Sequence, residues 1–115
     1  MGFEEQSEQK SKPDLTSALD QLWKRFLPEI TERVSILEST AKACATGGLT
    51  QEQREAAHAA AHKLAGTLGT FSLSRGTELA REFEQLCAGN EACSSNQVSH
   101  LAELAAEIRN IIASR

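Results

Sequence analysis

The chain has 115 residues, of which 40% are hydrophobic and 24% are charged, and its formal net charge is −4. This length supports one domain with a single core, and the composition is ordinary for a soluble globular protein. The acidic balance argues against binding to nucleic acid, which needs a basic protein face.

No apolar run approaches the roughly 18 residues of a membrane span, and the N-terminus lacks the apolar core of a signal peptide. We therefore expect a cytoplasmic protein that does not bind membranes. The three cysteines, Cys44, Cys87 and Cys93, are an odd number without metal-ligand spacing. In a reducing compartment they are expected to be free rather than joined in a structural disulfide.

The first twelve residues are polar, charged and without periodicity. Such a composition is typical of unpacked chain termini. Residues 1–12 are thus predicted to be a flexible N-terminal arm, and residues 13–115 a single domain.

A helical pattern begins at Leu15 and ends at Gly47 and Gly48, which are typical of a helix terminus. Proline lacks an amide donor and disfavours helix in the residue before it. We therefore expect a break or kink near Leu27, with Pro28 opening a new helix. The predicted buried stripe consists of Leu15, Leu19, Leu22, Trp23, Phe26, Ile30, Val34, Leu37, Ala41 and Cys44.

The next helix is predicted to begin after Thr50 and to continue to about Phe71. Thr50 and Gln53, three residues apart, form the pattern of a capping box. This helix carries both His58 and His62.

Two further helices follow. Ser74 is a plausible cap for the first of them, which closes at about residues 88–90, and Ser95 or Asn96 for the last. Short connections between amphipathic helices favour antiparallel neighbours. The sequence therefore predicts an all-α fold: an antiparallel up-and-down four-helix bundle with an additional N-terminal helical segment.

His62 is predicted to point away from the core. A helix advances about 100° per residue, which gathers the apolar side chains of its helix on the opposite face. Small residues surround the histidine, and each glycine in a helix interior costs about 0.8–1 kcal/mol relative to alanine. Gly66 and Gly69 therefore favour close approach by another molecule over helix stability. The pattern indicates a nucleophile that a partner's active site approaches closely.

Two other interpretations of His62 remain open. It can be a surface histidine without a role on an alanine-rich helix. It can also share a metal with His58, one turn earlier, and Glu55. Two imidazoles are too few for a stable zinc site, and no further ligand follows in the pattern, so we expect no bound metal.

The segment His62-Lys63-Leu64-Ala65-Gly66-Thr67-Leu68-Gly69, followed by Phe71, Leu79 and Glu84, resembles the signature of histidine-containing phosphotransfer (HPt) domains, the helical relays of two-component signal transduction. The resemblance covers residues 20–112. It implies that His62 becomes a phosphohistidine through its Nε2 atom, by transfer to or from an aspartate of a receiver domain. Gly66 would match the family's glycine, which makes room for the partner. The expected docking residues are His58, Ala59, Lys63, Ala65, Gly66 and Gly69.

The chain departs from the family pattern at two positions. Many members carry a lysine three residues after the histidine and a glycine ten residues after it, where this chain has Ala65 and Ser72. Lys63 projects about 160° away from Ala65 around the helix and is no simple substitute. Charge assistance to the phosphoryl group would then fall to the partner's own cation.

The expected function is that of a phosphorelay intermediate, which accepts a phosphoryl group on His62 from a receiver-domain aspartate and passes it to, or drains it from, a response regulator. A neutral imidazole is a competent nucleophile near pH 7, and phosphoryl transfer mainly needs positioning and charge stabilisation. The sequence offers no nucleotide-binding glycine loop and no kinase motif. We therefore expect a phosphocarrier rather than an enzyme, with no cofactor of its own and with Mg²⁺ held by the receiver.

The expected partners are receiver domains of response regulators or of hybrid histidine kinases, and the chain is expected to be a monomer. Arg81 and Glu84 would border the interface if their helix packs beside the histidine helix. The alternative is a helical adaptor that docks on a receiver domain without being phosphorylated, which the missing lysine at Ala65 favours. A metal-dependent helical-bundle enzyme would need repeated Glu-x-x-His pairs, which the sequence lacks.

Overall fold

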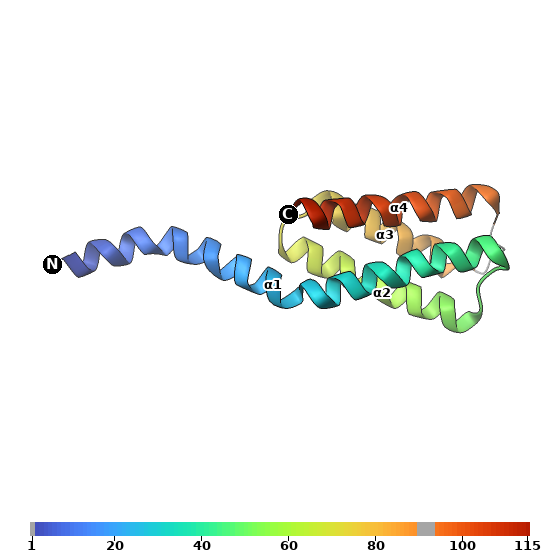
Figure 1. Ribbon diagram of the computed structural model, residues 1–115, viewed down its shortest axis with the longest axis horizontal. Helices are drawn as coiled ribbons and strands as arrows, with labels where there is room; N and C mark the ends of the chain where they lie inside the picture. The colour runs from blue at the N-terminus through green and yellow to red at the C-terminus, as the bar shows by residue number, and fades with distance from the viewer. Residues whose placement is uncertain (1, 90–93) are drawn as a thin grey trace.

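The computed structural model describes residues 2–89 and 94–115, with side chains from residue 16 onward. It contains four helices, α1 (Gly2–Thr46), α2 (Gln51–Thr70), α3 (Ser74–Ala88) and α4 (Ser95–Ser114). No strand occurs within those two ranges. In Figure 1 the C-terminal half of α1 lies in an antiparallel bundle with the other three helices, and its N-terminal half projects away from the bundle. The predicted all-α bundle is confirmed.

The order of packing within the bundle is cyclic. Helix α1 packs against α2 and α4, and α3 packs against the same two helices. The α2–α3 and α1–α4 seams therefore lie on opposite sides of the bundle. The histidine helix, α2, forms the first of these seams with α3. It takes no part in the α1–α4 seam.

Helix α1 runs without interruption through Pro28, so the predicted helix break was wrong. Pro28 removes the amide partner of the Lys24 carbonyl. Both residues are exposed, so water can replace the lost hydrogen bond. Trp23 before the proline and Ile30 after it are buried, so packing holds both sides of this point in one helix.

The length of α1 sets the length of the molecule. Its 45 residues at about 1.5 Å per residue span about 67 Å, close to the longest dimension of 68 Å. The segment predicted to be a flexible arm, residues 1–12, is helical from Gly2 onward. Its flexibility stays a prediction.

The core is built from apolar side chains of all four helices. The largest fully buried ones are Phe83, Ile30, Leu37, Leu64, Leu68, Leu101, Ile108 and Val34. Three residues of the predicted stripe on α1 are instead exposed, namely Leu19 at 37%, Leu22 at 38% and Phe26 at 37%. They lie where α1 leaves the bundle, so helical periodicity alone overestimated their burial.

The predicted capping box of α2 is confirmed. The Thr50 amide donates to Gln53 Oε1 at 2.9 Å, and the Gln53 amide donates to Thr50 Oγ1 at 3.1 Å. These bonds satisfy two backbone amides that the first turn of a helix leaves unpaired. The beginning of the histidine helix is therefore well defined.

The turn from α2 to α3 differs from the prediction. Ser74 is the first helical residue rather than the cap, and the N-cap Leu73 makes no side-chain capping bond. The backbone instead closes α2 with a Schellman motif, in which the Leu73 amide donates to the Leu68 carbonyl at 2.9 Å and Ser72 takes a left-handed φ of 60°. Glycine is the usual residue at that position.

The cap of α4 and one cysteine also differ from expectation. Ser94 caps α4 by accepting a hydrogen bond from the Gln97 amide at 3.2 Å, one residue before the predicted Ser95.

Cys87 is buried and free, and burial raises the pKa of its thiol to about 11. Cys44 is disulfide-bonded, so the expectation of free thiols was wrong for this residue. Cys93 lies outside the described residues.

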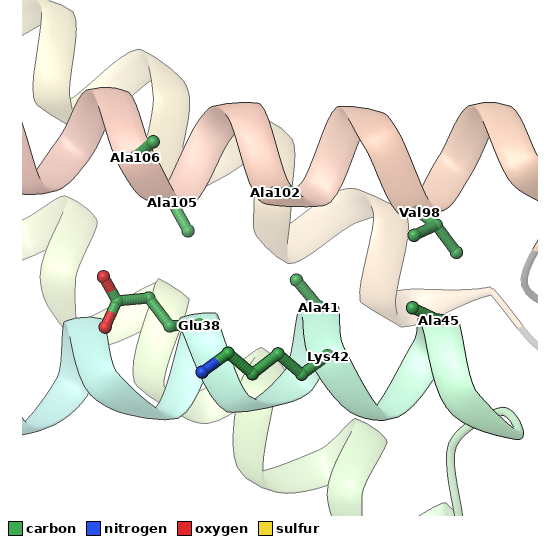
Figure 2. A pocket seen from close by; sticks show the side chains of 8 residues that line it. All are labelled: Glu38, Ala41, Lys42, Ala45, Val98, Ala102, Ala105 and Ala106. Carbon is green, nitrogen blue, oxygen red and sulfur yellow. The ribbon is translucent and has the colours of Figure 1, made fainter.

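A hollow of about 420 Å³ lies on the α1–α4 seam. Figure 2 shows alanines and Val98 along it, with the Glu38 and Lys42 side chains at its α1 edge. Arg109 of α4 donates two hydrogen bonds to the Glu38 carboxylate, at 2.6 and 2.8 Å, and ties the two helices together. None of the residues predicted for function lines this hollow. None of the described helices is long and apolar enough to cross a membrane.

Candidate functional site

His62 lies near the middle of α2, and 72% of its side-chain surface is exposed. The apolar residues Ala61, Leu64 and Leu68 of the same helix are buried. The predicted orientation of the imidazole, away from the core, is therefore observed.

Glu84 of α3 holds one edge of the His62 ring. The Nδ1 atom of His62 lies 2.9 Å from Glu84 Oε2, and the Glu84 side chain is only 19% exposed. An ionised carboxylate accepts hydrogen bonds but donates none, so the shared proton belongs to Nδ1. The Nε2 atom on the other edge of the ring then keeps its lone pair and faces away from the carboxylate.

A second imidazole meets the same carboxylate oxygen. His58 Nε2 lies 3.4 Å from Glu84 Oε2, and its side chain is about half exposed. Glu84 thus connects two histidines that are one turn apart on α2. The predicted placement of His58 beside His62 is observed, and its contact with Glu84 adds a reason for it.

Glu84 meets His62 because α2 and α3 are antiparallel and closely packed. Thr77 Oγ1 donates to the Ala65 carbonyl at 3.1 Å. Ala65 follows His62 on α2 and Thr77 precedes Glu84 on α3, as expected for two antiparallel helices. Gly76 permits this approach, since a Cβ there would lie 2.9 Å from Leu68 Cδ1. Two residues that are 22 positions apart in the sequence therefore share one hydrogen bond.

Gly66 has a different environment from Gly76. A Cβ at Gly66 would meet no atom of the described protein within 4 Å. Contacts with the described residues therefore do not explain this glycine, although it costs helix stability. Gly69 is intermediate, because a Cβ there would be in ordinary contact with Thr77 Oγ1 at 3.5 Å.

A cavity of about 360 Å³ opens beside His62 on the α2–α3 seam. Its lining consists of His58, His62, Ala65, Gly66, Arg81, Glu84, Gln85 and Ala88. Of the predicted docking residues, His58, Ala65 and Gly66 line this cavity. Ala59, Lys63 and Gly69 are exposed but do not line it.

Ala65 is only 5% exposed, so it forms the floor of the cavity rather than projecting from the surface. Helix α3 supplies the other half of the site. The sequence suggested Arg81 and Glu84 for this place if the two helices packed together, as they do. Gln85 and Ala88 were missed, although their spacing from Arg81 and Glu84 puts all four on one face of a helix.

No group of three or more histidine, cysteine, aspartate or glutamate side chains among the described residues is arranged to hold a metal ion. Glu55, the third ligand weighed for a metal site with the two histidines, accepts a hydrogen bond from Gln51 at 3.0 Å. The His62 imidazole is exposed, has the Glu84 carboxylate as its partner and lies beside the open surface at Gly66.

Comparison with known proteins identifies the family of this chain. The chain matches the Hpt domain family over residues 21–114, which include the bundle and the candidate site. Protein RcaC of Microchaete diplosiphon is 35% identical over 81 residues, which are 70% of this chain and 12% of that protein. The chain thus spans a small part of this relative, and no solved structure matches it significantly. The chain belongs to the Hpt domain family, whose members are phosphotransfer carriers of two-component signalling rather than kinases.

Proposed function

We propose that the chain is a phosphorelay intermediate in which His62 accepts a phosphoryl group from a receiver-domain aspartate. It then passes the group to a response regulator, or in the reverse direction drains it from one. The observation that carries this proposal is the 2.9 Å contact between His62 Nδ1 and Glu84 on a ring that is 72% exposed. It leaves Nε2 as an accessible nucleophile.

The chemistry of the transfer follows from the ring's protonation. Nε2 attacks the phosphorus, a new N–P bond forms, and the bond between phosphorus and the aspartyl oxygen breaks as the carboxylate leaves. The proton stays on Nδ1, so the ring gains positive charge as the bond forms. The Glu84 carboxylate already faces that proton and stabilises this charge without rearrangement.

The surface around His62 supports docking of a receiver domain. The aspartyl phosphate of a receiver has to reach Nε2, which requires small neighbours on the α2 surface. Ala59 and Gly66 provide them, and Gly66 has open space where a side chain would stand. A transient complex of this kind is expected at the low end of interface areas, below about 1,200 Å².

The same proposal assigns the remaining chemistry to the partner. The receiver holds Mg²⁺, and this chain acts as a cytoplasmic monomer without a cofactor and without kinase activity of its own. Its partners are receiver domains of response regulators or hybrid histidine kinases. These receiver domains recognise the α2–α3 seam. The chain itself binds neither nucleic acid nor a membrane.

The test is transfer from a receiver domain labelled with ³²P on its aspartate. The wild-type chain is expected to take up label that is stable in base and labile in acid, and His62→Gln is expected to take up none. His100→Gln is the matched control, since that half-exposed histidine pairs with Glu82 across the α3–α4 seam. Equal labelling of wild type and His62→Gln contradicts the proposal.

A second candidate function is a helical adaptor that binds a receiver domain without accepting phosphate. Ala65 favours it, because the lysine typical of the family is missing there. Titration of the chain with an unlabelled receiver measures binding separately from transfer. Binding without any label on the wild type would favour the adaptor.

A further inference from the structure

The phosphorylated state of the candidate site lacks an obvious positive partner on α2. A phosphoryl group on Nε2 carries close to two negative charges, and Glu84 adds another on the far side of the same ring. Phosphoryl transfer depends strongly on cations that neutralise such charge. Lys63 follows His62 in the sequence but does not line the cavity beside it.

Arg81 of α3 lines the cavity together with His62, Ala65 and Gly66. It precedes Glu84 by three residues, about 4.5 Å along the helix axis. Because α2 and α3 are antiparallel, this offset places Arg81 near the turn of α2 that holds Ala65 and Gly66, which line the same cavity. An arginine side chain is long enough to bridge one helical turn.

Arg81 is also uncommitted among the residues that the structure describes. It is exposed and forms no ion pair or hydrogen bond with any of them. Arg75 on the same helix differs, since it pairs with Glu78 at 3.8 Å and with Glu107 at 3.5 Å. Arg54, near the other end of the α2–α3 seam, donates to the Gly89 carbonyl at 2.7 Å.

We propose that Arg81 binds the phosphoryl group on His62, so that α3 supplies both the carboxylate that orients the ring and the cation that stabilises its cargo. This inference rests on the proposed function. The guanidinium keeps its protons and donates them as paired hydrogen bonds to two phosphoryl oxygens, a geometry that suits arginine better than lysine. No bond to Arg81 forms or breaks during transfer.

The experiment uses phosphoramidate, a small phosphodonor that needs no protein partner and so isolates the chain's own contribution. The rate of phosphohistidine formation and the rate of its hydrolysis are followed by ³¹P NMR. Arg81→Ala is expected to form phosphohistidine about tenfold more slowly, with Arg81→Lys in between, as for one charge-assisted contact at an exposed site. Arg75→Ala, an exposed arginine of the same helix with other partners, is expected to stay within twofold of wild type.

A rescue variant separates charge from structure. Ala65→Lys in the Arg81→Ala background puts a cation at the floor of the same cavity, whose volume is about 360 Å³. It is expected to restore most of the rate, which a purely structural role of Arg81 would not allow. Circular dichroism and thermal melting check that each variant is folded.

The outcomes distinguish this inference from the proposed function. A wild-type chain that is never labelled contradicts both. Label that depends on His62 but forms equally fast in Arg81→Ala overturns the role of Arg81 and leaves the phosphoacceptor in place. A slow Arg81→Ala that Ala65→Lys does not rescue also overturns it, since the loss is then not one of charge.

Discussion

Glu84 of α3 lies 2.9 Å from Nδ1 of His62 of α2, so one helix carries the imidazole and another sets its orientation and protonation. The contact joins the middle of α2 to the C-terminal third of α3. His58 approaches the same oxygen at 3.4 Å, which makes Glu84 the centre of a three-residue cluster.

Replacing Glu84 should slow phosphorylation more than it disturbs the fold. Glu84→Ala is expected to lower the phosphoramidate rate by about tenfold, because Nδ1 loses the carboxylate that stabilises the charged ring. The rate of Glu84→Gln should lie between those of the wild type and Glu84→Ala, since the glutamine amide oxygen still accepts the Nδ1 hydrogen bond but is neutral. NMR of the ring nitrogens checks the cause: the proton should reside on Nδ1 in the wild type and lose this preference in Glu84→Ala. Glu82→Gln, on the other seam of α3, is the control, and an equal loss there would contradict the prediction.

Gly66 should separate helix stability from docking. Gly66→Ala is expected to stabilise the protein by about 0.8–1 kcal/mol, because alanine is the better helix former and its Cβ meets no atom of the described chain within 4 Å. Gly66→Leu should keep its reaction with phosphoramidate but lose transfer from a phosphorylated receiver. Thermal melts and the two phosphodonors measure these effects.

Ala106→Leu is the matched control for Gly66→Leu, since Ala106 is an exposed small residue at the α1–α4 hollow. If both leucine variants lose receiver transfer equally, the docking surface has been placed on the wrong seam.

Ser72 should limit stability because it adopts the left-handed conformation in the turn after α2, at φ 60°. That conformation costs roughly 1–2 kcal/mol for a residue with a Cβ. Glycine avoids this cost, but its greater freedom in the unfolded chain cancels part of the gain in stability. Ser72→Gly is thus expected to stabilise the protein by about 0.5–1 kcal/mol. Chemical denaturation measures the change. Ser35→Gly, at an exposed position inside α1, should shift stability in the opposite direction, and the same sign for both variants would contradict the argument.

The Glu38–Arg109 pair should make part of the stability pH-dependent. The hydrogen bonds from Arg109 hold the pKa of Glu38 below its ordinary value. A lowered carboxyl pKa contributes stability that is fully present above the ordinary glutamate pKa of about 4.3 and is lost as the pH falls through the lowered value. Both side chains are more than a third exposed, so solvent screening keeps this contribution below about 1 kcal/mol.

Glu38→Gln is the variant that tests this pair. It should lower the free energy of unfolding at pH 7 and flatten its decline in acid, as measured by denaturation between pH 3 and pH 7. Glu29→Gln serves as control, since its 3.8 Å contact with Arg33 lies within α1 and joins no two helices. If Glu38→Gln loses stability in acid as the wild type does, the Glu38–Arg109 pair does not cause the pH dependence.

The sequence alone was sufficient for features that depend on local chain chemistry. The capping box at Thr50 and Gln53 needs only two residues three positions apart, and the exposure of His62 follows from the helical period of its apolar neighbours. The all-α bundle follows from the same periodicity. These features are local because a helix satisfies its backbone hydrogen bonds within a few residues of sequence.

Only the tertiary structure decided what stands beside His62 and how far α1 extends. Glu84 contacts the histidine, and Arg81 lines the cavity beside it, because of the α2–α3 register, which depends on close packing of Gly76 against Leu68. Likewise, burial on both sides of Pro28 keeps α1 continuous where local propensity predicts a break. The free energy of packing one helix on another comes from residues far apart in the chain, and no local pattern records which turns will meet.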